Sequence, residues 1–312
     1  MIMKNTFMLL CLAFIFLTNS HAFGQTTNLP APFGPHQWTA TVKVVGEDGN
    51  PVTDASVDIT YDIPPPPEPI EKSYGEIKGL TDTNGIFSAS HIDSSLGLGI
   101  IVSKSGYYTT HIGYQFYFDA KRQNPTFAPI LKKNGKSIAM YAKRIDSLRV
   151  PEFNKAIGYD LTVGDWISPY GKGVDTDLLI TERHTDPHSG YILSVSFPNL
   201  GDGIQEFDDP LLLQNAPNGE SDLRSDQNAP IDGYQPEFVQ TTYNQNQNFY
   251  FRVRTKLDEN GNVVSARYGK IYGNLAQFTY YFNPTSNDRN IEFDPKQNLL
   301  GGLQPTEQVG AP

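Results

Sequence analysis

Short stretches of alternating apolar and polar residues, separated by turn-forming residues, recur along most of this chain. In the stretch that follows Trp38, the residues DGNP at 48–51 form the expected turn between two such segments. Further turns are expected from DTNG at 82–85 and SG at 105–106. Side chains alternate between the two faces of a β-strand, whereas Gly, Asn, Asp and Pro favour tight turns. The pattern predicts an all-β chain in which the segments on either side of residues 48–51 pair as an antiparallel hairpin.

The first 24 residues have the layout of a secretory signal peptide. Lys4 precedes an apolar run from Phe7 to Leu17, and small residues follow near Ala22 and Gly24. The run is shorter than the roughly 20 apolar residues of a membrane-spanning helix. We expect cleavage after Gly24, so that the mature chain is secreted, periplasmic or attached to the cell surface and has no transmembrane segment.

The only cysteine, Cys11, lies inside this expected signal peptide. The mature chain therefore has no thiol for a disulfide, a cysteine nucleophile or a thiolate metal site. The net charge of the whole chain is −10, and loss of Lys4 makes the mature chain one unit more acidic. Nucleic acids and anionic lipids require a basic face, so we expect neither as a partner. An extracellular protein or a carbohydrate is the expected partner class.

The mature chain is long enough for two domains with cores of their own. We expect a flexible leader at 25–37, a first domain at 38–132, a second β-rich domain of unknown function at 136–294 and a C-terminal tail at 295–312. The prolines at 64–67 predict a stiff loop within the first domain. The strands expected in the second domain are residues 137–144, 177–181, 191–197, 249–256, 263–271 and 276–282.

Two further features of the second domain are expected from its local sequence. Asn260-Gly261 predicts a two-residue type I′ turn, with positive φ at both residues, between the strands at 249–256 and 263–271. The polar stretch 198–236 shows almost no periodicity and is expected to be a long loop.

The first domain resembles the carboxypeptidase regulatory-like domains, which are prealbumin-like Greek-key sandwiches of the immunoglobulin-like type. The resemblance covers residues 38 to about 132 and is carried by VKVVGEDGNPVTDASV, then GLTDTNGIF, then IIVSKSGYY. The proline-rich insertion and the aromatic tail HIGYQFYFDA depart from the family pattern. Such domains are mostly non-catalytic modules attached to peptidases, receptors and surface proteins. The resemblance thus implies an Ig-like β-sandwich and an accessory role.

Three residues of one short segment have the spacing of metal ligands. His184, Asp186 and His188 alternate along the chain, so an extended backbone points all three side chains to one side. Glu182 shares that side. The other interpretation is an ordinary polar turn around Pro187 with no metal, and this is the one that we favour.

Two acidic groups are candidates for calcium binding or for ordinary loop structure. Carboxylate oxygens are the ligands that extracellular calcium sites use, but neither group has the spacing of an EF-hand loop. Trp166 and Tyr170, within the second group, can stack on a sugar or belong to the core. The first group is Asp202, Glu206, Asp208 and Asp209, and the second is Asp160, Asp165, Asp175 and Asp177.

No complete catalytic motif occurs in the sequence. The patterns Gly-x-Ser-x-Gly, Ser-x-x-Lys and HExxH are absent, as is a phosphate-binding Walker loop. We therefore expect a secreted, non-catalytic binding or accessory protein of unknown ligand that needs no cofactor. The alternative is a secreted hydrolase that uses a divalent metal, with calcium or zinc as the ions considered, held by His184, Asp186 and His188.

Overall fold

The computed structural model describes residues 36–62, 74–93, 95–116, 124–184, 191–208, 218–241 and 247–312. Regular structure in these ranges is almost entirely β-strand, without an α-helix, so the expected all-β fold is confirmed. The expected signal peptide, most of the leader and the prolines at 64–67 lie outside the described residues. Within the same ranges, no helix has the length and apolar character needed to cross a membrane.

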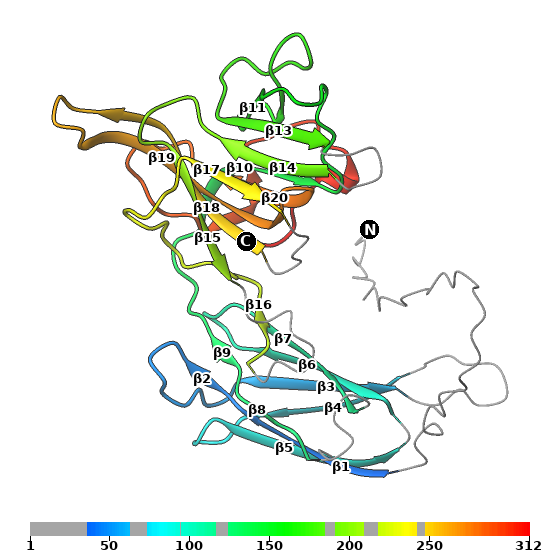
Figure 1. Cartoon of the computed structure of the whole chain (residues 1–312). Helices are drawn as coiled ribbons and strands as arrows, with labels where there is room; N and C mark the ends of the chain where they lie inside the picture. The colour runs from blue at the N-terminus through cyan, green and yellow to red at the C-terminus, as the bar shows by residue number, and fades with distance from the viewer. Residues whose placement is uncertain are drawn as a thin grey trace, which may run out of the picture.

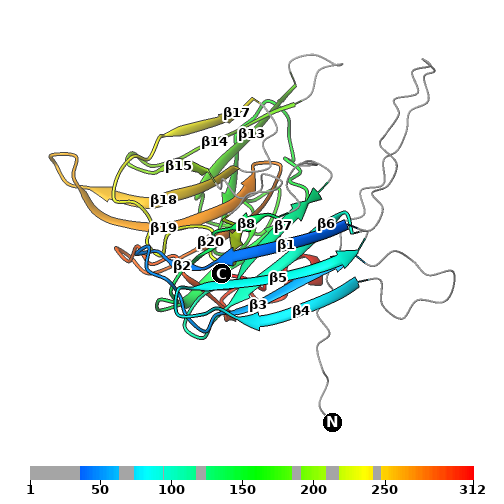
Figure 2. The ribbon, with the colours of Figure 1, turned by 90° about the horizontal axis from the view of Figure 1, so that it is seen from below.

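Two β-sheets packed face to face form the first domain, at the bottom of Figure 1. One sheet has the order β5-β1-β8, and the other has the order β16-β7-β6-β3-β4. Figure 2, the view from below, shows β1, β3, β4 and β5 running roughly along one direction. The strands are β1 (His36–Lys43), β3 (Ser56–Asp62), β4 (Tyr74–Leu80), β5 (Ile86–Asp93), β6 (Gly97–Ser103), β7 (Thr110–Gln115), β8 (Thr126–Phe127) and β16 (Glu220–Ser221). A short parallel pair, β2 (Val45–Gly46) and β9 (Ile130–Leu131), lies beside them.

The expected hairpin on either side of residues 48–51 forms only next to the turn, where Val45 makes an antiparallel bridge with Pro51 and Val52 N donates to Val44 O at 3.0 Å; the longer strands β1 and β3 do not pair with each other. β1 pairs with β5 and β8, whereas β3 pairs with β4 and β6 in the opposite sheet. The turn itself forms, with Gly49 N donating to Gly46 O at 2.9 Å, but the chain then crosses between the sheets. Val42 and Val57 therefore enter the same core from opposite sides. Alternation with period two is common to paired strands and to strands that face each other, so the sequence does not distinguish them.

The second domain, in the upper part of Figure 1, also contains two sheets. A six-stranded sheet has the order β15-β18-β19-β20-β10-β21, and a five-stranded sheet has the order β12-β11-β13-β14-β17. The strands are β10 (Ile138–Ile145), β11 (Ile157–Asp160), β12 (Asp165–Trp166), β13 (Leu178–His184), β14 (Tyr191–Ser196), β15 (Gly203–Asp208), β17 (Glu237–Gln240), β18 (Gln247–Leu257), β19 (Val263–Asn274), β20 (Gln277–Phe282) and β21 (Phe293–Asn298).

Both faces of the six-stranded sheet are apolar. On one face, Phe249 and Phe251 of β18 join a core with Ile180 and Val195 of the five-stranded sheet. The opposite face carries tyrosines of β18, β19 and β20, and it is covered by non-strand segments rather than by a third sheet. The residues that complete this second core include Ala229, Ile291 and Phe293, with Val309 packed against it. The segments around these residues are therefore part of the domain's structure.

All six strands expected in the second domain are present, as β10, β13, β14, β18, β19 and β20, with ends that differ by a few residues. The expectation of a loop over 198–236 is wrong for β15, which pairs antiparallel with β18, and for β16, which joins the first domain. β21 runs across residue 295, where the tail was expected to begin. The division of the chain into domains at 132–136 and 294–295 stays a prediction.

The turn between β18 and β19 has three residues instead of the two expected. Asp258 N donates to Asn262 O at 2.9 Å, and Gly261 N donates to Asp258 O at 3.0 Å. Gly261 has a φ of 83°, but Asn260 is not among the residues with positive φ. Asp258 Oδ1 accepts hydrogen bonds from Asn260 N and Asn262 N at 2.9 and 2.8 Å. These bonds favour a type I turn followed by one left-handed glycine, so the type I′ assignment is wrong.

Replacing Gly261 with valine should lower the free energy of unfolding by about 1–3 kcal/mol, because a branched residue is strained at this φ. No atom lies within 4 Å of the position that its Cβ would occupy, so crowding adds nothing. Gly261→Asn should cost less, since asparagine tolerates the left-handed region. Gly301→Val, where the space is equally open and φ is not positive, is the matched control. Thermal unfolding followed by circular dichroism measures all three, and equal stability of the valine and asparagine variants would contradict the turn geometry.

Candidate functional site

Two segments connect the domains. Residues 131–138 lead from the first domain into β10, and residues 218–229, here called the bridging segment, run between the second domain and the first (Figure 1). Within the bridging segment, β16 pairs antiparallel with β7, so that Glu220 lies opposite His111 and Ser221 lies opposite Thr110. One sheet thus combines strands from residues 56–115 with a strand at residues 220–221, far apart in the sequence.

Buried polar contacts fix the junction of the two domains. Glu292 is almost fully buried and accepts hydrogen bonds from Gly135 N, at 2.8 Å, and from the Tyr108 hydroxyl. A Cβ on Gly135 would clash with Glu292 Oε2, so a larger residue fits there only if that buried carboxylate shifts. Burial and the hydrogen bond to Glu292 raise the pKa of Tyr108, which keeps its hydroxyl protonated as a donor. Lys132 Nζ donates to the carbonyls of Arg224 and Ser225 at 3.0 and 3.1 Å.

Lys270 and Ser225 occupy the centre of this junction. Lys270 is fully buried, and its Nζ lies 3.2 Å from Ser225 Oγ and 4.8 Å from the ring centroids of both Tyr272 and Tyr281. Within the described ranges, no carboxylate forms an ion pair with it. Burial lowers the pKa of Lys270 well below its ordinary value, and the charge of Lys132 adds to this. A buried ammonium is costly, so burial favours the neutral form of this amine.

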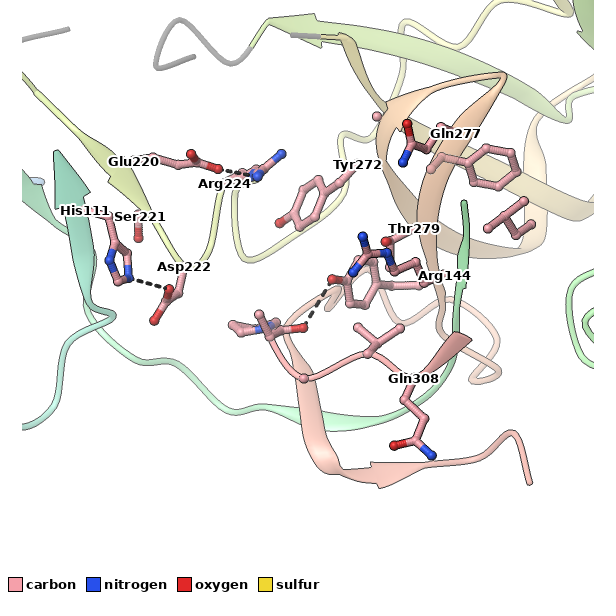
Figure 3. Close-up of a pocket in the computed structure, with 18 residues that line it drawn as sticks. His111, Arg144, Glu220, Ser221, Asp222, Arg224, Tyr272, Gln277, Thr279 and Gln308 are labelled. Carbon is pink, nitrogen blue, oxygen red and sulfur yellow. Dashed lines mark hydrogen bonds and ion pairs between the residues drawn. The ribbon is translucent and has the colours of Figure 1, made fainter. Parts of the chain in front are cut away.

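A cleft with a volume of about 590 Å³ opens beside the junction. Figure 3 shows the side chains that line it. Its volume lies within the range of roughly 300–1,000 Å³ that is typical of ligand sites. Strand β7 of the first domain, the bridging segment, strands β10, β19 and β20 of the second domain and residues 308–312 form its walls. The polar side chains at the cleft include His111, Arg144, Glu220, Asp222, Arg224 and Thr279.

Charges of both signs line the cleft. His111 Nε2 lies 3.2 Å from Asp222 Oδ1, and the hydrogen bond to Asp222 raises the pKa of His111 although burial opposes it. Arg224 pairs with Glu220, and its guanidinium lies 5.5 Å from the ring centroid of Tyr272. The cleft therefore offers paired charges and an aromatic ring to a ligand.

Ser221 contributes a hydroxyl that lacks a partner. Its Oγ is buried at the cleft and has no hydrogen bond to any described residue. Ser221, His111 and Asp222 are the residue types of a catalytic triad, but Ser221 is not hydrogen-bonded to His111 and is therefore not activated by it. An unsatisfied buried hydroxyl costs about 1–3 kcal/mol. A ligand that bonds to this oxygen would recover part of that cost.

Residues 308–312, here called the tail segment, form one side of the cleft. Tyr281 Oη donates to Ala311 O at 3.1 Å, and Val309 packs against the second core of the six-stranded sheet. Just before the tail segment, Glu307 forms an ion pair of 3.0 Å with Lys143. The tail segment is thus attached to β20 and β10 by side chains.

The predicted metal residues are only partly placed. His184 ends β13; its Nε2 lies 3.1 Å from Glu182 Oε1, and its ring lies 4.4 Å from that of Phe153. Asp186 and His188 lie outside the described residues, so a metal site at His184, Asp186 and His188 stays a prediction. Across the part of the chain that the structure describes, no three or more His, Cys, Asp or Glu side chains are grouped as they would be around a metal ion.

The acidic residues around 202–209 lie along a strand and its approach. Asp202 is buried, and its Oδ1 accepts a hydrogen bond from Thr255 N at 2.7 Å. Glu206 on β15 accepts one from Gln247 Nε2 at 2.8 Å. The side chain of Asp208 and all of Asp209 lie outside the described residues. The two placed carboxylates thus bind neighbouring strand residues.

Arg254 organises the other acidic group. Its Nε and Nη2 donate to the two oxygens of buried Asp177 at 2.6 and 2.9 Å. Asp160 Oδ1 lies 3.7 Å from Arg254 Nη2. Burial raises the pKa of Asp177 even though Arg254 opposes the shift. Burial also acts on Asp160, but hydrogen bonds from Thr162 Oγ1 and from backbone amides outweigh it and lower the pKa of that carboxyl. These residues join the loop at 160–177 to β18.

Trp166, a candidate for sugar stacking, packs against the core beside Tyr159, with ring centroids 5.3 Å apart. The sequence interpretation as a core aromatic agrees with this position. Residues of the cleft and of the junction were not anticipated, because no local motif contains them. Lys270 carried the only sequence signal: within the strand-like RYGKIYG, alternation places it on the same face as two tyrosines.

Comparison with known proteins identifies no family. No family model matches the chain, and no curated protein matches it. Solved structures with some similarity include 3-chlorocatechol 1,2-dioxygenase from Rhodococcus opacus, at 16% identity and a TM-score of 0.25 over 34% of this chain and 62% of that one. Chlorocatechol 1,2-dioxygenase from Pseudomonas putida has 10% identity and a TM-score of 0.25 over 32% of this chain and 61% of that one. A mutant of the shaft pilin SpaA from Lactobacillus rhamnosus GG has 12% identity and a TM-score of 0.24 over 55% of this chain and 90% of that one.

The match spans less than two thirds of either dioxygenase.

Arg254→Met should lower the free energy of unfolding by about 3–5 kcal/mol at pH 7, because it leaves Asp177 buried without its cation. The loss should shrink at pH 4.5. The pKa of Asp177 is raised in the folded chain, so this carboxyl favours the fold at a pH below its unfolded pKa and disfavours it increasingly as the pH rises. Removal of Arg254 raises the folded pKa of Asp177 further and so strengthens this pH dependence. Urea unfolding at both pH values measures this. Arg252→Met is the control, because Arg252 donates hydrogen bonds to the carbonyls of Gly201 and Ile231 and not to a carboxylate. If Arg254→Met lowers the free energy of unfolding equally at both pH values, the mechanism is contradicted.

Lys270→Met should remove a pH dependence from stability. The pKa of Lys270 is lower in the folded chain than in the unfolded chain, so the folded chain binds fewer protons. The free energy of unfolding of the wild type should therefore rise with pH, by up to about 1.4 kcal/mol per pH unit below pH 10. The difference between wild type and Lys270→Met isolates this slope in denaturant unfolding between pH 7 and 9.5. Lys256→Met, at an exposed position of β18, is the control and should show no such slope. A flat difference for Lys270→Met would mean that the amine is charged when buried.

Proposed function

We propose that the chain is an exported, non-catalytic accessory protein of the cell surface or extracellular space that binds a polar ligand in the cleft between its two β domains. The first domain, as a carboxypeptidase regulatory-like module, supplies β7 as one wall of the cleft and holds the second domain at a fixed orientation. The ligand contacts come from both domains.

The observation that carries this proposal is the unpartnered Ser221 hydroxyl at a cleft of about 590 Å³. Most buried polar groups in folded proteins are hydrogen-bonded, and those that are not require an explanation. Here the explanation is a ligand that completes the site. Arg224, Thr279 and Tyr272 stand at the same cleft and add further groups for recognition (Figure 3).

Binding accounts for the cleft better than catalysis does. Two ion pairs, His111 with Asp222 and Glu220 with Arg224, hold four of the ionisable side chains of the cleft against each other. A general base needs a nucleophile or an activated proton within hydrogen-bond reach, and Ser221 is not bonded to His111. The arrangement suits recognition by pre-positioned groups.

The test uses the purified chain from residue 25 onward, labelled and applied to arrays of defined glycans and peptides. We expect saturable binding without chemical change of the bound probe, as checked by mass spectrometry. Thr279→Trp, which fills the cleft, should reduce affinity at least tenfold. Thr126→Trp, at an exposed site of β8 away from the cleft, should have no effect.

Ser221→Ala separates binding from folding. The substitution removes the unsatisfied hydroxyl of Ser221, so the melting temperature should stay equal or rise. The affinity for the array ligand should fall several-fold. Turnover of the probe, or unchanged binding by Thr279→Trp, would refute the proposal.

A further inference from the structure

The tail segment lies in the cleft wall without belonging to any sheet. In the described ranges, residues 308–312 are outside every strand and form no backbone–backbone hydrogen bond with the rest of the chain. Two contacts attach them: the Tyr281 hydroxyl bonds the Ala311 carbonyl at 3.1 Å, and the Val309 side chain packs against the apolar face that contains Tyr281. A carbonyl oxygen and a small apolar side chain are features that any extended peptide offers.

We infer that the cleft binds extended peptides and that the tail segment is a built-in occupant of one side of it. This inference rests on the proposed function and adds the ligand class to it. A peptide that carries a small apolar residue at the position of Val309 competes with the tail segment for Tyr281. Displacement of the tail segment therefore accompanies binding.

The other walls of the cleft have the chemistry that a peptide requires. A peptide presents N–H donors and C=O acceptors at every residue, so it is best bound by a site that holds both donors and acceptors. Arg224 and Thr279 can donate, Glu220 and Asp222 can accept, and the Ser221 hydroxyl can do either. A polyanion would meet the two carboxylates, which disfavour it.

The burial of successive residues in the tail segment indicates which side chain of a peptide the cleft recognises. Val309 is partly buried, whereas Gln308 and Gly310 on either side are exposed. Alternation of this kind is what an extended peptide shows when one side chain enters a surface and its neighbours point away. The side chain at the Val309 position should therefore dominate recognition, with small apolar residues preferred and charged residues rejected.

The experiment removes residues 308–312 and returns them as a separate peptide. The probe is the pentapeptide Gln-Val-Gly-Ala-Pro, titrated at millimolar concentration into isotope-labelled protein and followed by NMR. The truncated chain should show saturable shifts at Tyr281 and Thr279, and the full chain should bind the probe at least tenfold more weakly. The matched control is Gln-Asp-Gly-Ala-Pro, which should also bind at least tenfold more weakly to the truncated chain.

A point variant of the 312-residue chain provides the same test if the truncated chain fails to fold. Val309→Asp places a carboxylate against the apolar face and should release the tail segment, so this variant should bind the probe as the truncated chain does. Tyr281→Phe, combined with the truncation, keeps the ring and should weaken probe binding several-fold. Lack of probe binding by either opened variant with an unchanged circular dichroism spectrum overturns the inference.

The same variants distinguish this inference from the proposed function. If they bind no peptide but still bind a glycan on the array, and Thr279→Trp abolishes that binding, the peptide class is wrong and the proposed function stands. If Thr279→Trp changes no binding at all, the cleft is not the site and both proposals are wrong.

Discussion

The six-stranded sheet of the second domain has two apolar faces, and the rest of the architecture depends on covering both. The five-stranded sheet covers one of them through Phe249, Phe251 and their neighbours. In the described part of the chain no third sheet covers the other, so Ala229, Ile291 and Val309 pack onto it from segments far apart in the chain. Burial of apolar area is the largest favourable term in folding, which explains why such irregular segments are held in place. The course of the bridging segment toward the first domain and the position of the tail segment both follow from this requirement.

Irregular segments carry backbone groups that no sheet satisfies, and the junction provides partners for them. Lys132 bonds the carbonyls of Arg224 and Ser225, and the Tyr250 hydroxyl accepts a hydrogen bond from Asp226 N at 3.0 Å. Tyrosine suits this face because its ring adds apolar area and its hydroxyl reaches a polar partner. Lys270 extends the same principle at greater cost, since its amine is fully buried with the Ser225 hydroxyl as its hydrogen-bond partner and burial lowers its pKa. The covering of one apolar face thus creates the polar junction beside which the cleft opens.

Local patterns in the sequence predicted the strands but not the places where they meet. The six expected strands of the second domain alternate clearly and are rich in β-branched or aromatic residues, so their secondary structure follows from local preference. β15 was missed because GIQEFD, with two acidic residues and a glycine, has weak strand preference and is held by its pairing with β18. Pairing across the sandwich was also beyond local information, as β1 and β3 show. The cleft combines His111 with Arg144 and with residues from position 220 onward, and no spacing along the chain indicates such a combination.

The construction of the cleft also determines how a ligand must act on the molecule. Its walls belong to the first domain, to the bridging segment and to the second domain, and the strand pairing of β16 with β7 and the hydrogen bonds of Glu292 and Lys132 connect them. A ligand that contacts both β7 and β20 binds only when these walls are in their observed arrangement, so its binding energy favours that arrangement over any in which the domains separate. The ligand stabilises this arrangement by RT ln(1 + L/Kd), where L is the free ligand concentration, which is about 2.7 kcal/mol at a concentration one hundred times Kd. In the proposed accessory role, occupancy of the cleft would therefore reinforce the relative orientation of the two domains that the junction contacts already hold.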